Sequence, residues 1–196
     1  MSSTLHLYAE TKLELGWVPV PFDERRRKKN PIDLTEELGG EHLGHLMALF
    51  GMGYQRHVRG SVEPIAPHRG LPSDLGDFYR EWWYRGGWGA GLGLSWLSAA
   101  EVINYGWDEK RATYRACVHR LYADLFDASS SFPDDFPDDA AMYIRRPPNS
   151  NTVWVEWESS CRDFVNQDYD TCVEDLLSCL LKLGDPATTR VIFWHY

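Results

Sequence analysis

The segment from Arg190 to Tyr196 constrains the fold of this chain most. It reads R-V-I-F-W-H-Y, so a strand formed here carries large apolar side chains on both of its faces. A strand with one solvated face alternates between apolar and polar residues, whereas a strand that is apolar on both faces lies inside a covered sheet. We therefore expect this segment to be an inner strand, with the rest of the chain built around it.

Further strands are predicted near both ends of the chain. Residues 5–10 alternate, with Leu5, Leu7 and Ala9 on one face, which is the pattern of a half-buried strand. Residues 11–20 can return beside them as an edge strand that ends at its prolines. Residues 142–145 and 152–159 are expected to form a second hairpin around the turn residues between them.

Helices are predicted where apolar residues recur at intervals of three and four. The expected helices are 41–52, a helix capped by Ser73 that runs through Trp83, 109–126 and 170–183. Ser98 and Glu101 have the spacing of a capping box, which predicts a short further helix directly after Ser95-Trp96.

These patterns predict an α+β fold. We expect a single domain over residues 1–196, with a mainly antiparallel sheet of four to six strands and about four helices. A length of 196 residues lies in the range of one domain.

The charge balance limits the partners of the chain. It has 20 Lys and Arg against 29 Asp and Glu, a net charge of −9, which opposes binding to long nucleic acids. A small anionic ligand held by a few arginines is still allowed. No apolar run is long enough to span a bilayer, so we expect a cytoplasmic protein without a membrane partner. The four cysteines lack metal-site spacing and are expected to be reduced thiols.

A candidate ligand site lies between residues 64 and 96. This stretch combines arginine, glycines, a serine and tryptophans, which can hold a phosphate and stack on a base. Five glycines fall within residues 86–94, which predicts a loop there. The candidate ligand-binding residues are Arg69, Gly70, Trp88, Gly89, Ser95 and Trp96, with His6 and Glu10 from the first strand. In the structural alternative, Arg69 braces a loop through backbone carbonyls, the tryptophans fill core and the glycines allow close packing.

The sequence does not point to a catalytic group or a cofactor. It contains no G-x-S-x-G or H-E-x-x-H pattern, and the glycine cluster lacks the lysine of a phosphate loop. His6 and Glu10 lie on the same side of a strand but about 13 Å apart by the strand rise, so a shared metal needs a third element. A metal-dependent phosphodiesterase or nucleotide hydrolase, using these two residues with His57 or His68, is the catalytic alternative.

The chain resembles a family of small proteins common in tailed phages and prophages. Members begin with D-I-H-x-x-x-E, continue through L-F-A-x-L-A-G-x-R, P-I-x-x-P-R-G-L-P-x-D and H-S-x-S-W-L-T-x-x-E-L, and end in V-R-I-V-F-W-F-D. The matching residues are His6, Glu10, Leu46 to Gly51, Pro64-Ile65, Arg69 to Pro72, Asp74, Ser95 to Ser98, Glu101 and Arg190 to Trp194. Thr4 stands where the family has aspartate, and Gly93-Leu94 or its neighbours replace the His-Ser pair.

The resemblance implies a function that the residue patterns do not show. Small phage proteins often counter host defences, and some sequester cyclic oligonucleotides or ADP-ribose-derived signals. We therefore expect a viral anti-defence protein that binds a nucleotide second messenger without turnover, as a homodimer or higher homo-oligomer. The alternatives are the metal-dependent hydrolase and a protein inhibitor of a host defence enzyme.

Overall fold

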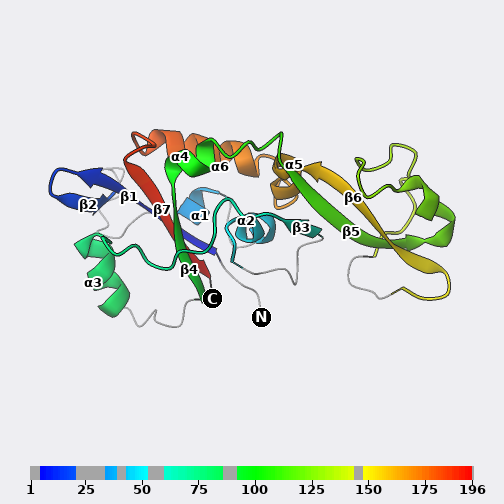
Figure 1. Cartoon of the computed structure of the whole chain (residues 1–196), viewed down its shortest axis with the longest axis horizontal. Helices are drawn as coiled ribbons and strands as arrows, with labels where there is room; N and C mark the ends of the chain where they lie inside the picture. Colours follow the sequence, from blue (N-terminus) through cyan, green and yellow to red (C-terminus); the bar gives the residue numbers. More distant parts are fainter. Residues whose placement is uncertain are drawn as a thin grey trace.

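The computed structural model of this chain contains two antiparallel sheets joined by short helices (Figure 1). It describes residues 5–20, 34–38, 43–52, 60–85, 92–143 and 148–195. The predicted α+β class is confirmed. The strands number seven within these ranges and are divided between two sheets, whereas we expected four to six strands in one sheet.

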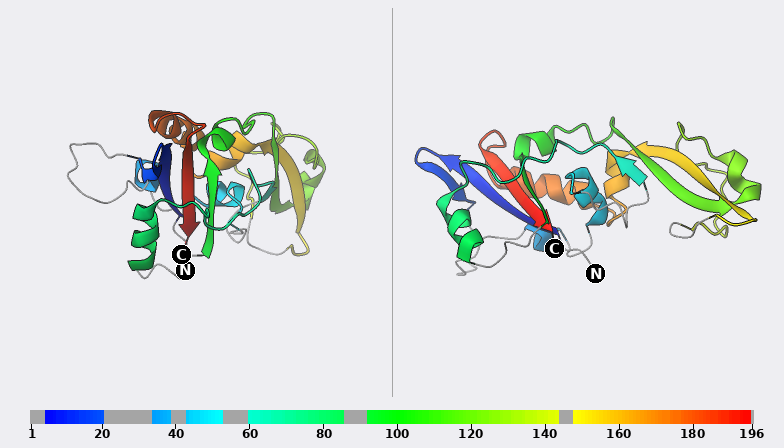
Figure 2. Two further views of the ribbon diagram at one scale, coloured as in Figure 1. Left: turned by 60° about the vertical axis from the view of Figure 1, so that its left-hand side comes forward. Right: turned by 60° about the horizontal axis from the view of Figure 1, so that its bottom comes forward.

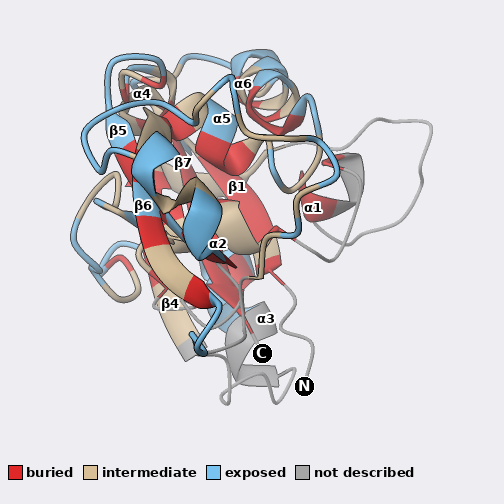
Figure 3. Ribbon diagram, turned by 90° about the vertical axis from the view of Figure 1, so that its right-hand side faces the viewer, coloured by how far each residue is buried: buried red, intermediate tan, exposed pale blue. Residues whose placement is uncertain are grey.

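The larger sheet has the strand order β2-β1-β7-β4. Its strands are β1 (Leu5–Leu13), β2 (Gly16–Pro19), β4 (Leu92–Ser98) and β7 (Thr189–His195). β7 lies between β1 and β4 and is buried at every position (Figure 3). The inner C-terminal strand is therefore confirmed, because only neighbours on both edges and cover on both faces remove all of its side chains from water.

The smaller sheet has the order β3-β5-β6 and extends away from the larger one. Its strands are β3 (Gly60–Val62), β5 (Arg111–His119) and β6 (Thr152–Ser160). β5 and β6 pair along their full lengths, and the 3-10 helix η1 (Arg120–Leu125) follows β5. Figures 1 and 2 show this twisted ribbon reaching one end of the elongated molecule. We call β5, β6 and the described residues between them the arm.

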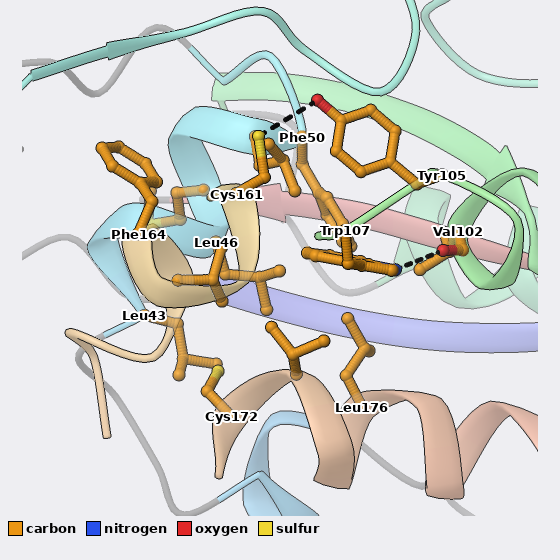
Figure 4. Close-up of a cluster of buried hydrophobic side chains, with 14 of the residues drawn as sticks. Leu43, Leu46, Phe50, Val102, Tyr105, Trp107, Cys161, Phe164, Cys172 and Leu176 are labelled. Carbon is orange, nitrogen blue, oxygen red and sulfur yellow. Dashed lines mark hydrogen bonds between the residues drawn. The ribbon is translucent and has the colours of Figure 1, made fainter. Parts of the chain in front are cut away.

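Two cores cover the two faces of the larger sheet. The main core contains β1, β4 and β7 side chains together with residues from five short helices. These helices are α1 (Leu34–Glu37), α2 (Gly44–Leu49), α4 (Ala99–Ile103), α5 (Cys161–Val165) and α6 (Cys172–Lys182). In Figure 4, Leu46 meets Phe164 and Cys172 within this core, and the indole N–H of Trp107 donates to the Val102 carbonyl at 2.9 Å.

A smaller core lies on the opposite face of the larger sheet. Helix α3 (Asp77–Arg85) and the segment before it pack there on β1 and β7. The buried residues of this core are Tyr8, Leu75, Tyr79, Ile192 and Trp194. Both faces of β7 are thus covered, which explains its unbroken apolar sequence.

The prediction of a helix over 109–126 is wrong. Within β5 the buried residues alternate with exposed or half-buried ones, as Ala112, Tyr114 and Ala116 do with Thr113 and Arg115. The apolar residues also fit a helical spacing, so the local sequence left both structures open. Pairing with β6, which is distant in sequence, favours the strand over the helix, because tertiary pairing overrides weak local propensity.

Three smaller expectations also differ from the structure. Residues 152–159 are expected to pair with 142–145 but pair with β5 instead, and of 142–143 only Tyr143 pairs, with Cys117. Ser73 lies in a turn, because α3 begins at Asp77. β4 begins at Leu92, within the range 86–94 for which a loop is expected, so Ser95 and Trp96 lie inside a strand. The capping box that Ser98 forms with Glu101 follows directly, as predicted. All four cysteines are free thiols.

Candidate functional site

The buried arginine of β7 organises the face of the larger sheet that α3 covers. Arg190 donates to Oε2 of Glu10 on β1 through Nε at 2.9 Å and Nη2 at 2.8 Å, and its Nη1 donates to Oδ1 of Asp74 at 2.7 Å. The other carboxylate oxygen of Glu10 accepts the backbone N–H of Gly76 at 2.9 Å. Burial raises the pKa of Glu10, and the hydrogen bonds from Arg190 and Gly76 oppose that rise.

Cations and indoles alternate across this face from strand to strand. The guanidinium carbon of Arg190 lies 3.8 Å from the ring centroid of Trp17 and 5.6 Å from that of Trp96. The guanidinium carbon of Arg69 lies 4.8 Å from the ring centroid of Trp96 on β4. Lys12 completes the series, 5.8 Å from Trp17. We call Lys12, Trp17, Arg190, Trp96 and Arg69 the cation–aromatic row. Cation–π contacts of this kind stabilise the stack by about 0.5–2 kcal/mol each.

Arg69 holds the chain as it passes around the edge of β4. The backbone N–H of Arg69 donates to the Ser95 hydroxyl at 2.9 Å, and its guanidinium donates twice to Glu101, at 2.9 and 2.5 Å. Gly70, next to it, has a φ of +68°, a conformation that glycine adopts without strain. The guanidinium of Arg69, with the hydrogen bonds from Ser98, lowers the pKa of Glu101 to about 2.

The structure therefore brings several predicted ligand-binding residues together, but bonds them to their own chain. Arg69, Ser95 and Trp96 converge at β4, and Glu10 lies two strands away, bonded to Arg190 of the cation–aromatic row. Arg69 braces a loop, as in the structural alternative, but through the Glu101 carboxylate and the Ser95 hydroxyl and not, among the described residues, through backbone carbonyls. A role of these residues in ligand binding stays a prediction.

The remaining predicted residues are placed in part. His6 stacks on Trp194 with ring centroids 5.5 Å apart, on the same strand as Glu10. His68 is exposed in the segment before Arg69. Trp88, Gly89 and His57 lie outside the described residues. Within the described part of the chain, no three His, Cys, Asp or Glu residues gather as metal ligands would.

A hollow of about 520 Å³ opens at the far end of the arm, away from the predicted site. Its walls come from the end of β5, the start of η1, the turn before β6 and residues 140–143. The lining residues are Cys117, His119, Leu121, Tyr122, Ala140, Ala141, Tyr143, Asn149, Asn151 and Thr152. Ligand sites usually have volumes of about 300–1,000 Å³ and combine apolar walls with a few polar groups.

Hydrogen bonds within the lining fix what it can offer a ligand. The His119 Nδ1 accepts the Leu121 N–H at 3.3 Å, so the neutral ring carries its proton on Nε2. The Asn149 Oδ1 accepts the Asn151 N–H at 2.8 Å. The amide nitrogen of Asn149 can then donate a hydrogen bond to a ligand. The Thr152 oxygen accepts the Asn149 N–H at 2.9 Å. The lining therefore combines nitrogen donors of His119 and Asn149 with the aromatic rings of Tyr122 and Tyr143.

Little in the sequence indicates the hollow. His119, Tyr122 and Tyr143 are spread over segments that only the β5–β6 pairing brings together. The one local sign is the Pro-Asn-Ser-Asn turn at 148–151, because asparagines in such turns bond to their own backbone. For Arg190 and Asp74 the sequence indicates a strand, the expected helix start and the resemblance to the phage family, but not their contact with each other.

Comparison with known proteins gives no further guide to this site. No protein-family model, no curated protein and no solved structure matches the chain. None of the helices in the described ranges is long and apolar enough to cross a membrane.

Proposed function

We propose that this protein binds and sequesters a small nucleotide-type signalling molecule, without turnover, in the hollow at the end of the arm. The single observation that carries this proposal is the hollow itself, with its two tyrosines, His119 and paired asparagines. The resemblance to phage proteins makes a viral anti-defence role the biological setting that we propose. A sponge of this kind needs affinity and no catalytic group.

The chemistry of the lining favours a nucleobase over an aliphatic ligand. The carbonyl oxygens and ring nitrogens of a base accept hydrogen bonds, and the hollow offers donors from His119 Nε2 and the Asn149 amide. Tyr122 and Tyr143 supply aromatic surface on which a flat ring can stack. Stacking on such side chains typically stabilises a bound base by about 1–3 kcal/mol.

Calorimetry against mononucleotides, linear and cyclic dinucleotides, cyclic trinucleotides and ADP-ribose derivatives tests the proposal. We expect saturable binding by at least one of these compounds, and chromatography should return that compound intact after the protein is denatured. Heat from none of them contradicts the proposal. A changed product on denaturation instead supports the hydrolase alternative.

A variant whose side chain fills the hollow shows whether the ligand binds there or at the cation–aromatic row. Ala141→Trp places an indole in the opening and should abolish binding, whereas Ala187→Trp, at an exposed turn of the larger sheet, should not. Arg69→Ala should also leave affinity unchanged. Loss of binding in Arg69→Ala but not in Ala141→Trp would show that the ligand binds at β4 and not in the hollow. Light scattering on the same samples tests the predicted homodimer or higher homo-oligomer.

A further inference from the structure

The face of the arm that contains the hollow carries further side chains next to it, and these bear on the length of the ligand. The inference rests on the proposed function, because it concerns the same site. On β5, Cys117 and His119 both line the hollow. Directly opposite residues of an antiparallel pair point to the same face. Trp154 is opposite Cys117, so its side chain stands on the face that contains the hollow.

The next residues along this face form a second planar platform. Arg115 lies two residues before Cys117 on β5, and its guanidinium carbon is 4.7 Å from the ring centroid of half-buried Trp154. Arg115 also pairs with Glu156, which lies opposite it, at 3.5 Å between Nε and Oε1. The guanidinium thus lies over the indole, and the outer surface of such a stack can bind a flat ring and an adjacent anion.

The Arg115 guanidinium is accessible to a ligand. The Arg115 side chain is 54% exposed and that of Glu156 is 46% exposed. Such exposed pairs contribute only about 0–1 kcal/mol, so a phosphate can replace the Glu156 carboxylate at little cost. Arg69 differs, because two hydrogen bonds tie it to Glu101, which is itself bonded to the helix cap at Ser98.

We propose that the ligand contains two planar rings joined by an anionic linker. The first ring lies in the hollow, the linker lies beside Arg115 and the second ring packs against the stack that Arg115 and Trp154 form. Both platforms stand on one face of one ribbon, so a single short ligand can span them. This assigns dinucleotide-type ligands to the site over ligands with a single base.

Paired titrations test this assignment. Each nucleoside 5′-monophosphate is compared with its homodinucleotide (AMP with ApA, GMP with GpG, CMP with CpC, UMP with UpU). We expect the best dinucleotide to bind at least about tenfold tighter than its mononucleotide, because one additional base is stacked. Trp154→Ala should remove this difference and leave the mononucleotide affinity unchanged, and Trp154→Phe should keep most of it. Leu125→Ala, exposed on η1 outside the lining, is the matched control.

The outcomes separate this inference from the proposed function. Equal affinities for the two members of every pair overturn the inference and leave the proposed function in place. An equal loss of both affinities in a folded Trp154→Ala variant, checked by circular dichroism, also overturns it. If no mononucleotide or dinucleotide binds, the inference fails; if the cyclic and ADP-ribose compounds also give no heat, the proposed function fails with it.

Discussion

Arg190 and Glu10 face each other across β7 and β1 and form a buried ion pair, with exposed fractions of 2% and 0%. Asp74 approaches Arg190 at 2.7 Å and also accepts the Trp17 indole N–H at 2.7 Å. The pair thus joins the two central strands to the segment before α3. A buried pair contributes little net stability by itself, but the loss of one partner leaves an uncompensated charge.

We therefore expect Glu10→Ala to lower the free energy of unfolding by about 3 kcal/mol. The double variant Glu10→Met with Arg190→Met should recover much of that loss, since it buries no charge. Urea unfolding of the single and double variants measures both values. A change below about 0.5 kcal/mol in Glu10→Ala contradicts the prediction.

The Arg69–Glu101 pair predicts a dependence of stability on acid. The pKa of Glu101 is lowered to about 2 from an ordinary value of 4.5, so its ionised form is stabilised by folding. This stabilisation is complete above pH 4.5 and is lost as the pH falls toward 2. Both side chains are about a third exposed, so solvent screening limits the contribution to about 1 kcal/mol.

Glu101→Gln should thus be less stable than the parent protein at pH 7, by about 1 kcal/mol, and nearly equal to it at pH 2. Unfolding by urea at a series of pH values checks this. Glu109→Gln, at an exposed position, is the control and should differ little from the parent across the range. A difference for Glu101→Gln that grows toward low pH is the opposite result.

Gly76 is the residue that lets the segment before α3 approach the Arg190–Glu10 pair. A Cβ atom there would lie 2.4 Å from the Trp17 carbonyl oxygen and 2.5 Å from Oε1 of Glu10. Gly76→Ala should destabilise the protein by at least about 2 kcal/mol, because two neighbours must move. Gly44→Ala should be neutral or slightly stabilising, since nothing lies within 4 Å of a Cβ atom at that helical position. Thermal unfolding of both variants compares them; equal melting temperatures contradict the prediction.

Asp168 supplies the cap that α2 lacks in its own sequence. Its carboxylate accepts the N–H groups of His45 and Leu46 at 3.0–3.1 Å and the His45 ring nitrogen Nδ1 at 2.8 Å. Asp168→Ala should cost about 2 kcal/mol, as expected for lost charge-assisted hydrogen bonds at a helix start. Denaturant unfolding measures this cost, with exposed Asp170→Ala as the control. Equal effects of the two substitutions contradict the assignment.

Local sequence patterns predicted the elements whose burial follows from their own side chains. β7 is an unbroken apolar run, the first hairpin alternates and α6 has a helical period, and the structure contains all three. The capping box of α4 could equally be predicted from the sequence, because Ser98 and Glu101 form hydrogen bonds within one helical turn.

Only the tertiary structure decided the arm and the candidate sites. The β5 sequence fits two periodicities, and its pairing with β6, about 40 residues later, selects the strand. The same pairing gathers His119, Asn149 and Thr152 around the hollow. The partners of Arg69 and Arg190 likewise come from other strands and loops. The spacing of apolar residues within a segment indicates which of its faces is buried. The identity of a long-range partner depends instead on how the folded sheets bring distant residues together.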